Sequence, residues 1–90
     1  MRTLQEVRKE IDEIDTALLE LFRRRMAVMG EVAQAKRAAG IPLTDPVREQ
    51  LVLDKVAAAC PGLEDEARKL YAAIFAISKE RQSKLSTSKK

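Results

Sequence analysis

The chain has 90 residues, enough for a single domain with a modest core. Aromatic residues make up only 3% of it, and this poverty in strand-forming side chains excludes a β-sandwich or barrel. The net charge is +3, and two of the basic residues, Lys89 and Lys90, lie in a polar tail. So small an excess argues against a nucleic-acid partner.

Two further classes of protein are excluded by composition. The chain contains no histidine and a single cysteine, Cys60, so we expect no intramolecular disulfide, no ordinary zinc site and no histidine-dependent nucleophile. No apolar run approaches the roughly 20 residues that span a membrane, and the N-terminus lacks the apolar core of a signal peptide. We therefore expect a cytoplasmic protein with no membrane partner.

The first element expected in the chain is one long helix from about Thr3 to Ala39, which ends at Gly40. Its apolar residues alternate three and four positions apart, which is the spacing of a heptad seam. The seam positions are Leu4, Val7, Ile11, Ile14, Leu18, Leu21, Arg25, Val28, Val32 and Ala35. Two helices of half this length cannot cover the whole seam, so we predict an all-α homodimer whose long helices pack together.

Two shorter helices follow the long one. Asp45 followed by Pro46 is typical of an N-cap and first helical position, and the helix that they begin should end near Cys60. After a break at Pro61-Gly62, a third helix is expected from about Glu64 to Lys84. Residues 1–82 then form one domain, and we expect the polar tail 83–90 to be disordered.

Two cationic residues interrupt the apolar face of the long helix. Arg25 occupies a seam position, and Lys36 lies eleven residues further on. This spacing places them within about 20° of one face and roughly 16 Å apart along the axis. Arg25 is either a snorkelling or acid-paired arginine or half of a clamp for a small dicarboxylate. Lys36 is either a solvated lysine or the other half.

The two shorter helices carry similar signals. Arg48 lies in a first helical turn, where its charge opposes the helix dipole, so it is either a surface residue or the neighbour of an anion. Ser78 and Gln82 continue the apolar stripe of the third helix at i, i+4 spacing. They indicate either a helix that emerges from the core or one wall of a polar pocket. Together these residues suggest a cation-rich pocket lined by all three helices.

Polar and apolar residues follow one another along the chain in a definite order and spacing. They are Leu4, Val7, Arg8, Ile11, Ile14, Asp15, Leu18, Leu19, Leu21, Arg25, Val32, Lys36, Asp45, Arg48, Glu49, Ile77, Ser78 and Gln82. This pattern, which covers nearly the whole chain, resembles the all-helical class of chorismate mutases. The resemblance implies an intertwined dimer of three-helix protomers that rearranges chorismate to prephenate in phenylalanine and tyrosine biosynthesis. We expect no fused domain beside this one, so the protein would be a stand-alone mutase.

The resemblance further implies roles for eight of the polar positions. Arg8 from the other subunit, with Arg25 and Arg48, would hold the two carboxylates of chorismate.

The remaining positions would surround the reacting atoms. Lys36 and Gln82 would contact the ether oxygen, and Glu49 and the backbone of Asp45 would contact the ring hydroxyl. Ser78 would support a carboxylate. The rearrangement is a unimolecular pericyclic shift that needs no cofactor or metal, and none is expected.

Two alternatives stay open. Isochorismate-pyruvate lyase shares this fold and much of the cationic pocket. A non-enzymatic helical dimer could instead bind nucleic acid or protein, but that function predicts basic residues on one exposed face. The cationic residues quoted above are spread over two helices and are expected to point inward.

Overall fold

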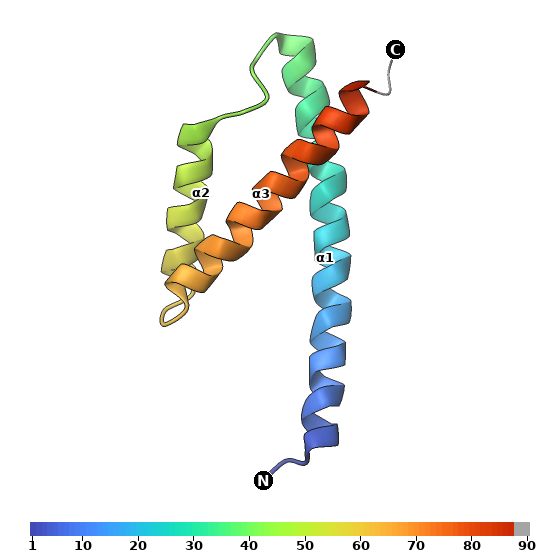
Figure 1. Cartoon of the computed structure of the whole chain (residues 1–90), viewed down its shortest axis with the longest axis vertical. Coiled ribbons are helices and arrows are strands. Elements are labelled where there is room, and N and C mark those ends of the chain that lie inside the picture. The colour runs from blue at the N-terminus through green and yellow to red at the C-terminus, as the bar shows by residue number, and fades with distance from the viewer. Residues whose placement is uncertain (88–90) are drawn as a thin grey trace. The chain divides into compact units, whose positions relative to one another are not determined.

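Three α-helices make up the fold in the computed structural model, which describes residues 1–87 (Figure 1). They are α1 (Leu4–Ala39), α2 (Pro46–Ala59) and α3 (Glu64–Thr87), and no strand occurs within the described residues. The prediction of an all-α chain with one long and two shorter helices is confirmed. The chain divides into two compact units, one comprising Met1–Glu31 and the other beginning at Val32.

A reciprocal capping box begins α1. The hydroxyl oxygen of Thr3 accepts a hydrogen bond from the Glu6 amide at 3.1 Å. In return, Oε1 of Glu6 accepts one from the Thr3 amide, also at 3.1 Å. The hydrogen bond from the Thr3 amide lowers the pKa of the Glu6 carboxyl, and the Thr3 side chain lowers it further by a smaller amount. The first turn of α1 is thus held by a carboxylate at the positive end of the helix dipole.

The C-terminus of α1 is closed by a Schellman turn. Gly40 has a φ of +72°, a left-handed conformation that glycine adopts without steric cost. The Ile41 amide donates to the Lys36 carbonyl at 2.8 Å, and the Gly40 amide donates to the Arg37 carbonyl at 3.2 Å. The turn therefore fixes the end of the helix one turn after Lys36.

The apolar seam of α1 lies open to solvent in a single chain. Its large apolar side chains before Gly30 are between 37% and 63% exposed: Leu4, Val7, Ile11, Ile14, Leu18, Leu21 and Val28. Among the side chains described, those of residues 1–84, the buried apolar ones are all alanines, Ala33, Ala57 and Ala67. One chain alone therefore builds no core from large apolar side chains.

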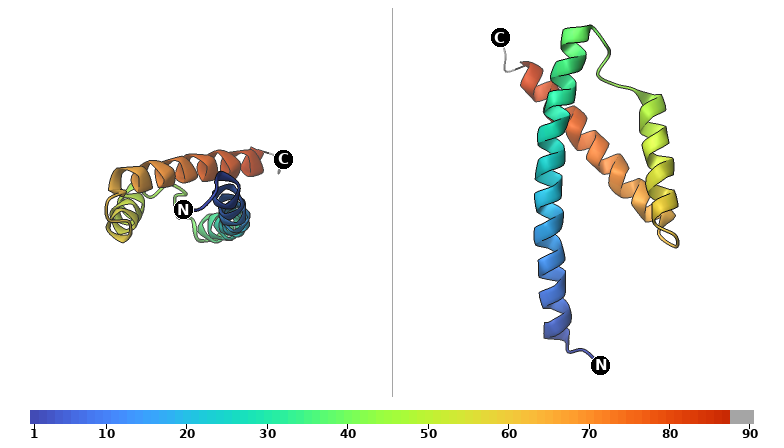
Figure 2. Two further views of the ribbon diagram at one scale, coloured as in Figure 1. Left: turned by 90° about the horizontal axis from the view of Figure 1, so that it is seen from below. Right: turned by 180° about the vertical axis from the view of Figure 1, so that it is seen from behind.

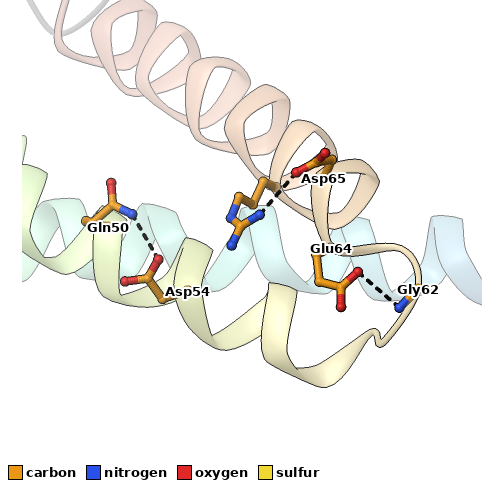
Figure 3. A network of polar contacts seen from close by, with 6 residues as sticks. Gln50, Asp54, Gly62, Glu64 and Asp65 are labelled. Atoms are coloured by element: carbon orange, nitrogen blue, oxygen red, sulfur yellow. Dashed lines mark hydrogen bonds and ion pairs between the residues drawn. The ribbon is translucent and has the colours of Figure 1, made fainter.

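A hairpin of α2 and α3 forms much of the unit that begins at Val32, and the two helices lie side by side near their connecting turn (Figures 1 and 2). The Cys60 amide caps α2 by donating to the Ala57 carbonyl at 3.2 Å. Gly62 has a φ of +88°, and its amide donates to Oε1 of Glu64 at 3.0 Å (Figure 3). Hydrogen bonds from the Glu64 amide and then the Gly62 amide lower the pKa of Glu64.

The end of α3 differs from its predicted position. The helix continues through Thr87, past the expected end at Lys84, so residues 83–87 of the predicted tail are helical. Residues 88–90 of that tail lie outside the described residues, and their disorder stays a prediction. Within residues 1–87, no helix is both long enough and apolar enough to cross a membrane.

The capping box makes the start of α1 sensitive to acid. A carboxyl whose pKa is lowered in the folded state stabilises that state above its unfolded pKa, and this stabilisation is lost as the pH falls through the folded pKa. In an NMR titration, the Thr3 amide resonance should therefore shift with a midpoint below the ordinary glutamate pKa. Glu6→Gln keeps the cap without the titrating group, so its Thr3 amide should not respond. A midpoint at or above the ordinary value would contradict the capping role of Glu6.

Candidate functional site

Lys36 lies in the last turn of α1, where its side chain is half-buried. The chain reverses at Gly40, and the Nζ atom of Lys36 donates a hydrogen bond to the Leu43 carbonyl at 3.4 Å. This contact uses one of the three N–H donors of the ammonium group. The loop between α1 and α2 thereby holds Lys36 at the end of its helix, in a position that the sequence alone did not determine.

The N-terminus of α2 positions three of the predicted site residues. Asp45 is the N-cap, as predicted, and its Oδ1 atom accepts from the Arg48 amide at 3.0 Å. The Asp45 carbonyl accepts the first helical hydrogen bond, from the Glu49 amide, also at 3.0 Å. Arg48 and Glu49 are thus neighbours in a first turn of fixed geometry, with the arginine exposed and the glutamate half-buried.

Glu49 is engaged by a lysine that the sequence analysis did not single out. The Nζ atom of Lys79, on α3, lies 3.1 Å from Oε1 and 3.0 Å from Oε2 of Glu49. The pair therefore joins α2 to α3 across thirty residues of sequence. The one available signal was position, because Lys79 directly follows Ser78 and points within about 60° of Gln82 on an α-helix.

Two polar side chains are buried on α3. Ser78 is 5% exposed and Gln82 is 9% exposed, and they lie one helical turn apart on the same face. A helix that was merely emerging from the core would expose them, so their burial argues against that alternative. Burying a hydroxyl and an amide is unfavourable unless they are hydrogen-bonded. That this face of α3 lines a polar pocket stays a prediction.

The two remaining predicted residues, Arg8 and Arg25, belong to the unit Met1–Glu31. Arg8 is exposed and Arg25 is half-buried. Both lie on α1, which is helical throughout this unit, so the seventeen residues between them span about 25 Å along the axis. The same spacing points the two side chains about 100° apart. One chain cannot bring both guanidinium groups to one small molecule.

The unit that begins at Val32 carries several cations and hydrogen-bond donors among and beside the predicted site residues. Within the part of the chain that the structure describes, no cluster of acidic or cysteine side chains is arranged to hold a metal ion. Lys36, Arg48 and Lys79 instead offer N–H groups, and Gln82 adds a neutral amide. Such a set suits an anionic ligand that carries several oxygen atoms.

Comparisons with known proteins show what the chain is similar to. The family model described as chorismate mutase type II matches residues 7–83. The solved structure of chorismate mutase form II from Thermus thermophilus is similar, with a TM-score of 0.84 and 30% sequence identity. The match covers 89% of this chain and 93% of that one.

Two curated relatives are more similar over shorter stretches. Chorismate mutase of Methanocaldococcus jannaschii is 42% identical over 57 residues, which are 63% of this chain and 58% of that protein. The 4-amino-4-deoxychorismate mutase of Streptomyces venezuelae is 39% identical over 64 residues, which are 69% of this chain and 62% of that protein. The chain thus spans less than two thirds of the length of either relative.

The N-cap of α2 should be worth a measurable part of the stability. Asp45→Ala removes the acceptor for the Arg48 amide and should lower the free energy of unfolding by about 1 kcal/mol. Asp45→Asn, which can still cap, should lose much less. Urea denaturation followed by circular dichroism, at one protein concentration for all variants, measures both changes. Equal stability of the alanine and asparagine variants would show that the side chain of Asp45 does not cap α2.

Proposed function

Because the chain belongs to the chorismate mutase type II family, we propose that it catalyses the rearrangement of chorismate to prephenate. One observation carries this proposal: the family match extends over residues 7–83, a range that includes every predicted substrate-binding residue. The burial of Ser78 and Gln82 on one face of α3 supports it. The comparisons favour neither isochorismate-pyruvate lyase nor a nucleic-acid or protein-binding dimer.

The proposed chemistry asks little of the protein beyond geometry and charge. In a Claisen rearrangement one carbon–oxygen bond breaks while a carbon–carbon bond forms, within one molecule and without a nucleophile. Catalysis then consists of holding the flexible enolpyruvyl chain over the ring, which removes rotational freedom before the barrier. Fixed hydrogen-bond donors add to this by stabilising the negative charge that develops on the ether oxygen.

Lys36 and Gln82 are the proposed donors to the ether oxygen. Lys36 supplies a full positive charge, and its contact with the Leu43 carbonyl limits the positions that its Nζ atom can take. Gln82 supplies a neutral hydrogen bond from a buried position, where water competes little. Glu49 and the Asp45 backbone are the proposed partners of the ring hydroxyl.

The two carboxylates of the substrate require the arginines. We propose that Arg25 and Arg48 hold them together with Arg8 of a second copy of the chain, and that Ser78 supports one of them. The separation of about 25 Å between Arg8 and Arg25 along α1 leaves no way for one chain to supply both. The exposed seam of α1 offers the surface on which two copies would pair. A two-fold dimer then contains two equivalent composite sites.

The proposed activity is tested by adding chorismate to the purified protein and following the loss of its absorbance, with the product identified by chromatography. Prephenate is the expected product. A protein that leaves chorismate unchanged but releases pyruvate and salicylate from isochorismate would be the lyase instead. No turnover of either compound would overturn the enzymatic proposal.

Removing the charge at Lys36 should slow the chemical step. One hydrogen-bond donor to a developing oxyanion typically raises kcat by two or more orders of magnitude. Lys36→Ala should therefore lower kcat by about a hundredfold or more. Lys55→Ala, which removes an exposed lysine of α2 that has no proposed role, should behave like the wild type. Circular dichroism should show the same helix content for both variants. Near wild-type turnover by Lys36→Ala would exclude Lys36 from the ether-oxygen site.

The composite site can be tested by complementation. Homodimers of Arg8→Ala and of Arg25→Ala should each be nearly inactive. In a mixed dimer one site receives both defects and the other receives neither, so co-refolding should restore activity. Random pairing makes half of the dimers mixed, with one intact site each, and recovery should approach about a quarter of wild-type activity. Verified mixed dimers without activity would remove Arg8 from the shared site.

A further inference from the structure

The ion pair between Glu49 and Lys79 differs from its neighbours in what it connects. The Arg68–Asp65 and Lys84–Glu80 pairs link positions three or four apart on one helix, and the Arg2–Glu10 pair lies at the start of α1. Glu49 and Lys79 instead lie on α2 and α3, and their side chains are only 27% and 46% exposed. A pair this accessible to water adds little to stability, so stability alone does not account for its geometry.

The geometry of the pair leaves Glu49 able to bind a ligand. The Nζ atom of Lys79 lies at almost equal distances, 3.1 and 3.0 Å, from the two carboxylate oxygens. One ammonium placed in this way balances the charge of the carboxylate as a whole and not that of a single oxygen. Each carboxylate oxygen can accept more than one hydrogen bond, so a ligand hydroxyl can still donate to Glu49. It would meet an acceptor whose negative charge is already balanced.

We propose that Lys79 determines specificity at the ring position that Glu49 contacts, by favouring a neutral hydroxyl over a cationic amine. This inference rests on the proposed function, which places the ring hydroxyl of chorismate at Glu49. An unbalanced carboxylate would attract an ammonium group strongly, whereas the Lys79 charge beside it repels one. Discrimination of this kind works by an unfavourable contact with the wrong ligand rather than by a better contact with the right one.

One relative of this chain is named for the amine-bearing substrate. The Streptomyces venezuelae protein is, by its name, a mutase for 4-amino-4-deoxychorismate, in which an amine replaces the ring hydroxyl. An alkyl amine is protonated near pH 7, so the two substrates differ by one positive charge at the group that faces Glu49. A residue that sets the net charge at this point therefore selects between them. Lys79 is a specificity-determining residue that acts through Glu49 and not a catalytic one.

The test compares the two substrates on one set of variants. Lys79→Met and Lys79→Gln both remove the charge, and the ratio of kcat/KM for 4-amino-4-deoxychorismate to that for chorismate should rise about tenfold or more. Lys79→Arg keeps a cation that can contact both oxygens of Glu49, and its ratio should stay near that of the wild type. Lys84→Met is the matched control, because it removes a lysine of α3 whose ion pair stays within that helix. Its ratio should not change.

Each outcome decides the inference. Equal losses on both substrates in Lys79→Met and Lys79→Gln, or no change on either, would overturn it while the wild type still converts chorismate. A shift of the ratio in Lys84→Met as large as in Lys79→Met would also overturn it, because net charge alone would then be responsible. A wild-type protein that converts no chorismate would overturn the proposed function itself, and the inference with it. The glutamine variant, which keeps a polar side chain at this half-exposed position, provides the measurement if the methionine variant does not fold.

Discussion

An α-helix of 36 residues with large apolar side chains along one face is unfavourable in water for as long as that face stays exposed. In α1 these side chains are between 37% and 63% exposed, and the single chain offers no core of large residues in exchange. Burying one such side chain completely contributes about 1.5–3 kcal/mol, so pairing two copies of the seam recovers a large free energy. This exposed surface requires a partner, and in the proposed homodimer a second copy of the same chain covers it.

The same requirement connects the fold to the proposed chemistry. A straight helix long enough to need a partner also separates Arg8 from Arg25 by about 25 Å, which makes a site within one chain impossible for both. Pairing the helices antiparallel about a two-fold axis would bring Arg8 of each copy to the site of the other. The dimer is thus proposed to complete the carboxylate clamp, while the unit beginning at Val32 supplies Lys36, Glu49 and Gln82 from its own helices. Catalysis by clamping and fixed charge needs no group beyond these.

The helices could be predicted from local sequence signals, whereas the contacts between helices could not. Gly40, the Asp45-Pro46 cap and Gly62 act on residues next to them, so the bounds of α1 and α2 and the start of α3 followed directly. No glycine or proline follows Lys84, and α3 continues through Thr87 because nothing in the sequence stops it. The bond between Lys79 and Glu49 depends on how α2 and α3 are aligned, which no local pattern encodes. For Ser78, spacing left two alternatives, and only its burial could distinguish them.

Sedimentation of the active species shows whether the protein works as a dimer. A thin band of the protein is layered on a solution of chorismate in the analytical ultracentrifuge. The absorbance of chorismate falls wherever the active species has passed, so the movement of this front gives the sedimentation rate of the species that performs the reaction. We expect one active species with twice the 10.1 kDa mass of the chain. Chorismate loss that moves with a helical species of 10.1 kDa would contradict both the pairing of the seam and the shared site.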